Sequence, residues 1–113
     1  MTIPKFIHKL RDTPEEVTFQ DTMQVIDVNY NFKSVSFING EVTNDVGQNM
    51  GSCKLFSFAK IQNLNKEETL YCFGEHYKSV INTPEGNDHQ NIRNFIKTGW
   101  EGISFEESPL VEK

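Results

Sequence analysis

Apolar residues recur through much of the chain at intervals of three and four, which is the period of an amphipathic helix. The clearest case follows Thr13-Pro14-Glu15-Glu16, where a hydroxyl, a proline and acidic residues stand in the order that begins helices. Apolar side chains with helical spacing come next, at Phe19, Met23, Ile26 and Tyr30. The pattern predicts a helix over about 14–30. Ahead of it, Phe6, Ile7 and Leu10 also have helical spacing and are expected to pack onto the core.

The same period predicts two helices in the second half of the chain. Asn65-Lys66-Glu67-Glu68 repeats the capping signature, and the apolar positions that follow it extend the helix to about residue 81: Leu70, Phe73, Tyr77 and Val80 or Ile81. Asn87, with Gln90 three residues later, predicts the cap of another helix that ends at Gly99. Its inner face is expected to carry Ile92, Phe95 and Ile96.

Alternation of apolar and polar residues indicates short strands between and after these helices. Val35 and Phe37 alternate with serines before the Asn39-Gly40 turn, and Ile103 and Phe105 alternate near the end of the chain. We expect the closing strand to pair with residues 34–38. The run from Ser52 fits both periods, and we favour a helix there. The expected fold class is α+β, a small domain of about four helices packed on a short, mostly antiparallel sheet.

Length and composition are consistent with one domain over residues 1–113. A chain of 113 residues with 36% hydrophobic content and nine Phe can bury a core without disulfides or metal. Residues 106–113 are polar and contain Pro109, so we expect a loosely held tail there. The segment Asn44 to Gly51 is rich in amides and glycine and is predicted to form an ordered loop.

Charge and cysteine content exclude several partners. The net charge is −5 and no run of Lys or Arg forms a phosphate-binding patch, so we expect no nucleic acid partner. No apolar run is long enough for a signal peptide or a membrane span, so we expect no membrane partner and a cytoplasmic location. Two cysteines are too few for a disulfide scaffold.

Two amide-rich segments carry the candidate binding residues. Residues 39–53 and 87–94 are dense in side chains that cap loops and equally recognise sugars, peptides or nucleotides. We expect them to form one polar cleft for a small polar ligand or for a protein or peptide partner. The candidate ligand-binding residues are Asn39, Glu41, Asn44, Asn49, Asp88, His89, Gln90, Asn91, Arg93 and Asn94.

His89 and Arg93 each allow a functional and a structural interpretation. His89 could act as a general base, a metal ligand or an anion contact, but its spacing to Ile92 and Ile96 is also that of a core histidine. Arg93 could hold a carboxylate or phosphate, or could clamp nearby chain. Trp100 is interpreted either as a stacking platform or as a core anchor, with the anchor favoured.

Cys53 is the candidate nucleophile, because it follows Gly51-Ser52 at an expected helix start, where free amides lower a thiol pKa. With His89 or His76 as the base it would define a small Cys-His hydrolase or transferase; the alternative is a buried cysteine. The carboxylates and histidines have no spacing that demands an ion, so we expect no metal and no cofactor. Their candidate set is Glu41, Asp45, Glu75, His76 and His89.

Three long strings of sequence resemble one protein family, the HopJ family of type III effectors. They are VTFQDTMQVIDVNYNF over 17–32, NGEV with GQNMGSCKLFSFAK within 39–60, and PEGNDHQNIRNFIKTGW over 84–100. The resemblance covers nearly the whole chain and implies a bacterial protein related to proteins delivered into host cells by type III secretion. It implies no catalytic residue.

Three classes of function remain after these considerations. The leading one is a small binding or interaction domain that uses the amide-rich cleft. The second is a Cys-His enzyme acting through Cys53 and His89, and the third is a translocated effector that acts by contact with a host protein. The arrangement of residues 39–53 and 87–94 in space tests the first class. The reactivity of Cys53 tests the second, and delivery of a reporter fused to residues 1–20 tests the third.

Overall fold

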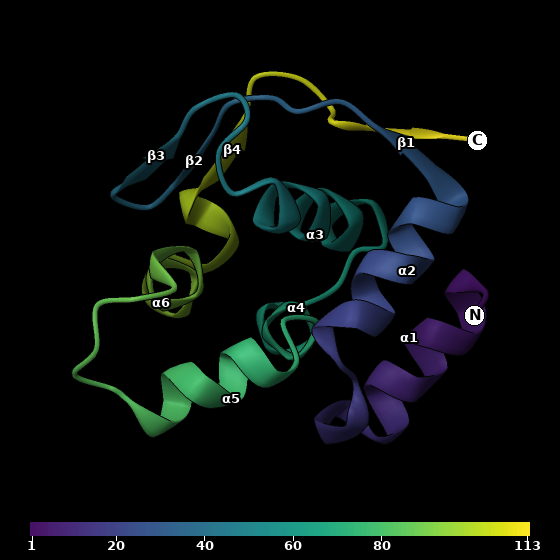
Figure 1. Ribbon diagram of the computed structural model, residues 1–113, viewed down its shortest axis with the longest axis horizontal. Helices are drawn as coiled ribbons and strands as arrows, with labels where there is room; N and C mark the ends of the chain where they lie inside the picture. Colours follow the sequence, from purple (N-terminus) through teal and green to yellow (C-terminus); the bar gives the residue numbers. More distant parts are fainter.

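Helix α3 (Met50–Ile61) lies at the centre of the computed structural model, which describes residues 1–113 (Figure 1). Its buried residues are Cys53, Leu55, Phe56, Ser57, Phe58 and Ala59, which cover nearly the whole circumference of the helix. A helix that is buried around most of its circumference has little room for a polar face, so its sequence lacks a clear amphipathic period. The favoured helical interpretation of this ambiguous run is confirmed.

The other elements surround α3. The helices are α1 (Ile3–Asp12), α2 (Phe19–Asn29), α4 (Lys66–Tyr71), α5 (Glu75–Asn82) and α6 (Gln90–Thr98), with 3-10 helices η1 (Pro14–Glu16) and η2 (Gly99–Gly102). The strands are β1 (Tyr30–Phe32), β2 (Phe37–Asn39), β3 (Val42–Asn44), β4 (Ile103–Phe105) and β5 (Leu110–Glu112). The α+β class is confirmed, with six α-helices where about four were expected.

The strands form two small antiparallel sheets rather than one. The first has the order β3-β2-β4 and contains the expected pairing of the closing strand, with Phe37 opposite Phe105. The hairpin from β2 to β3 turns at Gly40, in agreement with the Asn39-Gly40 signal. The second sheet pairs β1 with β5 and buries Leu110. Residues 106–113, expected to be a loose tail, therefore carry a paired strand, because Leu110 supplies an apolar anchor.

An aromatic cluster around Phe56 joins the central helix to its neighbours. The Phe56 ring centroid lies 4.9 Å from that of Phe95, 5.5 Å from Phe73, 6.1 Å from Phe37 and 6.3 Å from Trp100. Such tilted and edge-on ring pairs stabilise a core beyond the area that they bury. Trp100 also donates its indole N–H to the Leu64 carbonyl at 3.0 Å. These contacts agree with the interpretation of Trp100 as a core anchor.

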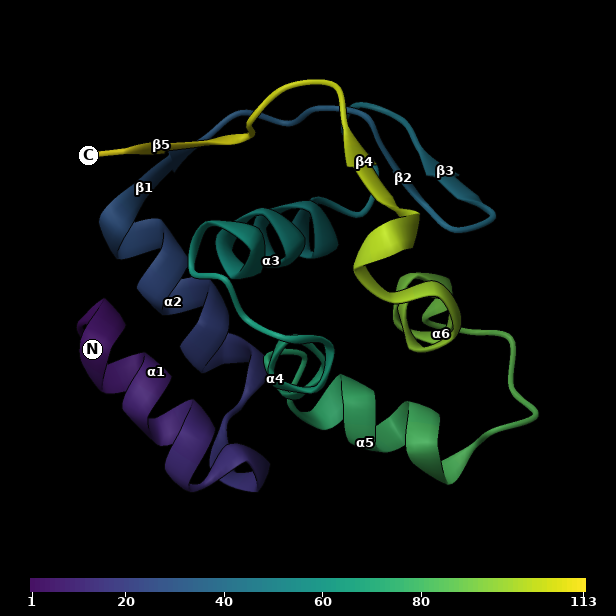
Figure 2. The ribbon, with the colours of Figure 1, turned by 180° about the vertical axis from the view of Figure 1, so that it is seen from behind.

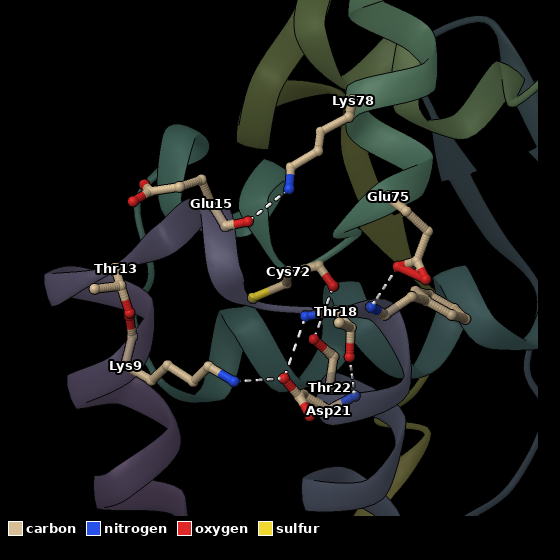
Figure 3. A network of polar contacts seen from close by, with 10 residues as sticks. Lys9, Thr13, Glu15, Thr18, Asp21, Thr22, Cys72, Glu75 and Lys78 are labelled. Carbon is tan, nitrogen blue, oxygen red and sulfur yellow. Dashed lines mark hydrogen bonds and ion pairs between the residues drawn. The ribbon is translucent and has the colours of Figure 1, made fainter.

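The N-terminal helices differ from the expected single helix over 14–30. The signature at Thr13 forms only the 3-10 turn η1, and α2 begins after Thr18, whose hydroxyl accepts from the Asp21 N–H at 3.1 Å. The Asp21 carboxylate in turn accepts from the Thr18 N–H and pairs with Lys9 (Figure 3). Two cap signatures compete within six residues, and the reciprocal one prevails because it satisfies two free N–H groups. As expected, α1 packs Phe6 and Leu10 into the core.

A single residue, Gly74, breaks the helix that was expected to run continuously from 66 to 81. The capping box of Asn65 and Glu68 is confirmed, but α4 ends at Tyr71 and α5 begins at Glu75. Gly74 has φ of 57°, and a Cβ there would lie 2.5 Å from the Phe19 nitrogen. Only glycine fits so close to another backbone in this conformation. The start of α2 therefore occupies the space that a continuous helix would need.

Polar contacts hold this break in place, as Figure 3 shows. The Thr22 hydroxyl donates to the Cys72 carbonyl at 2.7 Å, and the Glu75 carboxylate accepts from the Phe19 N–H at 2.8 Å. Seen from behind in Figure 2, α5 then extends from α4 toward α6, on the side of the molecule away from α1. The break therefore positions the first turn of α5, which carries His76, near the start of α6.

Candidate binding cavity

A cavity of about 470 Å³ lies where the starts of α2, α3, α5 and α6 meet. Its lining comprises Phe19, Val42, Asn49, Gly51, Ser52, Phe73, His76, His89, Gln90, Asn91 and Ile92. Residues 39–53 and residues 87–94 both contribute, so the two amide-rich segments border the same space. Of the ten candidate ligand-binding residues, four line it: Asn49, His89, Gln90 and Asn91.

Helices α3 and α6, which begin at the cavity, both lack a side-chain cap. The residues before them, Asn49 for α3 and His89 for α6, adopt the left-handed conformation, with φ of 50° and 49°. In that conformation neither side chain accepts from the following amides. The N–H groups of Gly51 and Ser52, and those of Gln90 and Asn91, make no hydrogen bond within the protein. Uncapped N–H groups of this kind give a helix start a partial positive charge.

Helix α6 starts later than the sequence indicated. Asn87 was expected to cap it, but the first helical residue is Gln90, and the Gln90 side chain donates to the Asn87 carbonyl at 2.5 Å. His89 therefore precedes the helix and does not continue its apolar face. The core-histidine interpretation is wrong for this reason, and His89 is exposed.

Three rings form one wall of the cavity. The centroid of His76 lies 4.9 Å from that of Phe19, edge-on, and 5.1 Å from that of His89, at an interplanar angle of 37°. The rings come from the starts of α2 and α5 and from the residue before α6, so they connect three elements. This wall therefore has an apolar part, the phenyl ring, beside a polar part, the two imidazoles with their N–H groups.

Behind the cavity, the amides of the hairpin and of α6 form a buried network. Asn44 and Asn91 pair reciprocally, with Nδ2 to Oδ1 distances of 3.2 and 2.9 Å. Asn39 donates to the Asn91 carbonyl at 2.7 Å, and Asn49 donates to Asn44 Oδ1 at 2.6 Å. Asn39 and Asn44 are fully buried and do not line the cavity, and Asn39 Oδ1 has no partner. These two amides hold Asn91 and Asn49 in place at its edge.

The remaining candidates lie away from the cavity. Asn94 Oδ1 accepts from the Glu41 N–H at 3.3 Å, and the Glu41 side chain is exposed. Arg93 clamps the loop before α6, donating to the Asp88 carboxylate at 2.6 Å and to the Thr83 carbonyl at 2.7 Å. The hydrogen bond from Arg93 lowers the pKa of Asp88. The guanidinium of Arg93 is taken up by these contacts, which agrees with the interpretation of Arg93 as a clamp of the nearby chain.

Cys53 does not line the cavity, although Ser52 does. Its thiol is buried, and its sulfur lies 3.8 Å from the Val35 carbonyl oxygen. Burial raises the pKa of Cys53, which is the opposite of what a nucleophilic thiolate requires. Burial also raises the pKa of Cys72. The helix start is where the sequence indicated, but this cysteine faces the core rather than the free amides.

Several lining residues had no signal in the sequence. Phe19 and Phe73 were predicted only as apolar positions of helices, and His76 was considered as a base for Cys53 or as a member of the metal-ligand set. They meet because Gly74 breaks the chain and the start of α2 packs against the break, a contact between residues far apart in sequence. Gly51 and Ser52 had a usable signal, since small residues that open a helix leave its first amides accessible.

The structure contains no group of three or more His, Cys, Asp or Glu side chains that could hold a metal ion. None of its helices has the length and apolar character needed to cross a membrane.

Fold and site together define a small α+β domain with a polar cavity at two helix starts. Comparison of the sequence with protein-family models matches residues 3–110 to the family described as HopJ type III effector protein. The chain belongs to the HopJ family. No curated protein matches the sequence.

A solved structure has the same fold along the whole chain. It is the crystal structure of "unknown function protein VPA0580", with a TM-score of 0.98 and 50% sequence identity. The match covers 100% of this chain and 95% of that one. The architecture that positions the cavity is therefore also that of a relative with half of its residues different.

The buried amide network makes a prediction about stability. Replacing Asn44 or Asn91 by Ala should each lower the free energy of unfolding by about 1–3 kcal/mol, because the partner amide is left buried without a hydrogen bond. The double variant should cost less than the sum, by about 0.5–3 kcal/mol, since both partners are then absent. Urea denaturation measures all three. Asn87→Ala, at an exposed position, is the control and should cost little; strict additivity of the two buried substitutions would contradict the network.

The cysteines make a prediction about reactivity. Iodoacetamide should modify neither Cys53 nor Cys72 in the folded protein at neutral pH, because both thiols are buried and their pKa values are raised. Modification should appear only across the urea unfolding transition, as followed by mass spectrometry. The raised pKa values favour the neutral thiols of the folded state. The protection of the thiols from modification should therefore weaken as the pH rises above the pKa of a cysteine in the unfolded chain. Fast alkylation of Cys53 in the folded protein would restore it as a candidate nucleophile.

Proposed function

We propose that the protein is a binding domain that holds a small polar ligand, or a polar side chain of a peptide, in the cavity between the starts of α3 and α6. The observation that supports this is the meeting of the two amide-rich segments around one space. Hydrogen-bond donors without partners line it, and a buried amide network holds them in position. Preorganised polar groups of this kind fix the orientation of a ligand.

The size and character of the lining fit such a ligand. A volume of about 470 Å³ falls within the roughly 300–1,000 Å³ of small-molecule sites. Phe19, Phe73 and Ile92 give apolar surface, whereas Ser52, Gln90 and the two histidines give polar groups. A ligand with one apolar face and one polar end would use both.

Binding is favoured over Cys-His catalysis by the position of the thiol. Cys53 is buried outside the cavity lining, so the histidines of the cavity have no cysteine nucleophile in the same space. The Cys-His alternative therefore lacks the shared site that it needs.

A substitution that fills the cavity tests the proposal. The probe is a mixture of small polar compounds, namely amino acids, sugars, simple amides, carboxylates and phosphates, followed by backbone amide NMR. At least one compound should shift the amides of residues 49–52 and 89–92 together. Ser52→Phe should abolish these shifts, because the new ring occupies the space.

The matched control is Ser79→Phe, the same change at an exposed position of α5 that does not line the cavity. It should leave the shifts intact. Shifts confined to other surfaces, or shifts that survive Ser52→Phe, would place binding elsewhere and refute the cavity as the site.

We also propose that the protein resides in the bacterial cytoplasm and is delivered by type III secretion, which membership of the HopJ family supports. A fusion of residues 1–20 to a reporter enzyme should then enter host cells. These residues contain α1, which is folded onto the core through Phe6 and Leu10. The measurement is reporter activity inside host cells, with a strain that lacks a working secretion apparatus as control. Equal activity from both strains, or none from either, would count against delivery.

A further inference from the structure

The charge of the cavity differs from that of the chain. Acidic residues number sixteen and the net charge is −5, yet no Asp or Glu lines the cavity. Its only ionisable side chains are His76 and His89. A cation would find no carboxylate here. The lining offers imidazole and amide N–H groups instead, and these are the donors that bind oxyanions.

The carboxylates next to the two histidines in sequence do not line the cavity, and each is hydrogen-bonded to another group. Glu75 accepts from the Phe19 N–H at 2.8 Å, and this hydrogen bond lowers its pKa. Asp88 accepts from Arg93, which lowers its pKa in the same way. Both carboxylates are thus committed to backbone or guanidinium donors. The ring centroids of His76 and His89 lie 5.1 Å apart, and no Asp or Glu lines the cavity beside them.

Backbone donors converge on the same space from two directions. The N–H groups of Gly51 and Ser52 begin α3, those of Gln90 and Asn91 begin α6, and none has an acceptor within the protein. Each helix is longer than two turns, so each start carries the partial positive charge of a full helix. Together with the histidine pair, these N–H groups make the cavity rich in hydrogen-bond donors.

We propose that the ligand of this cavity is an oxyanion, with a phosphate or carboxylate group held between the imidazoles of His76 and His89 and the first amides of α3 and α6. The proposal rests on the proposed function and names the class of its ligand. The apolar surface of Phe19 and Phe73 then contacts the remainder of the ligand.

Three probes of similar size test the class: inorganic phosphate, acetate and its neutral counterpart acetamide. Titration into labelled protein should shift the amides of Gly51, Ser52, Gln90 and Asn91 saturably with phosphate, with acetate or with both. Acetamide should not shift them. The arm that saturates at lower concentration identifies phosphate or carboxylate as the preferred group.

Two variants connect the binding to the histidines. His89→Asn keeps a residue that tolerates the left-handed conformation, and His76→Phe keeps a ring against Phe19. Each should weaken anion binding about tenfold, the loss expected for a charge-assisted hydrogen bond. His8→Asn, at the exposed third histidine on α1, should leave it unchanged.

The proposal is overturned if neither anion saturates, if acetamide binds as well as acetate, or if both variants retain full affinity. The comparison of acetate with acetamide uses the unaltered protein, so it decides the question even where a variant unfolds. If neutral compounds bind in the cavity and anions do not, this proposal is refuted but the proposed function is not. No binding of any compound would remove both.

Discussion

Burial of α3 around most of its circumference is the constraint on which the rest of the structure depends. A helix buried to this extent must be covered by several elements at once, and here the sheets, α2, α4 and α6 cover it. Phe56 has aromatic partners on β2, on α6, on η2 and just after the end of α4, so its ring fixes the positions of these elements relative to one another. The N-terminal end of α3 is where this cover stops, and the cavity lies at that end.

Local signals located most elements of the fold. The capping box at Asn65, the turn at Asn39-Gly40 and the stop at Gly99 depend on neighbouring residues, and each was found where the sequence indicated. The pairing of the closing strand with β2 could also be predicted, since both strands show the alternating pattern.

The errors arise where contacts between distant residues override a local signal. The cap at Thr13 gave way to that at Thr18, and the helix over 66–81 was broken because the backbone of Phe19 approaches Gly74. No pattern within either segment reveals the other. The start of α6 moved for a related reason, since Arg93 holds the preceding loop and leaves His89 in the left-handed conformation.

The candidate site was only partly accessible from sequence. Amide density indicated correctly that residues 39–53 and 87–94 come together, but not how the amides divide their roles. Asn39 and Asn44 are internal and bond other amides, whereas Asn49 and Asn91 reach the cavity. The sequence does not distinguish an asparagine that hydrogen-bonds within the protein from one that is available to a ligand, because the residue type is the same. The contribution of Phe19, Phe73 and His76 depended on the tertiary fold alone.

Each of the two sheets takes one strand from residues 103–113. β4 completes the sheet of the hairpin, and β5 is the only partner of β1. During synthesis from the N-terminus, the backbone groups of β1 and of one edge of β2 therefore stay unpaired until residues 103–112 are available. Such long-range pairing forms late, after its loop-closure entropy is overcome. Formation of both sheets is thus coupled to the presence of residues 103–112, so a chain truncated before them lacks a strand from both sheets at once.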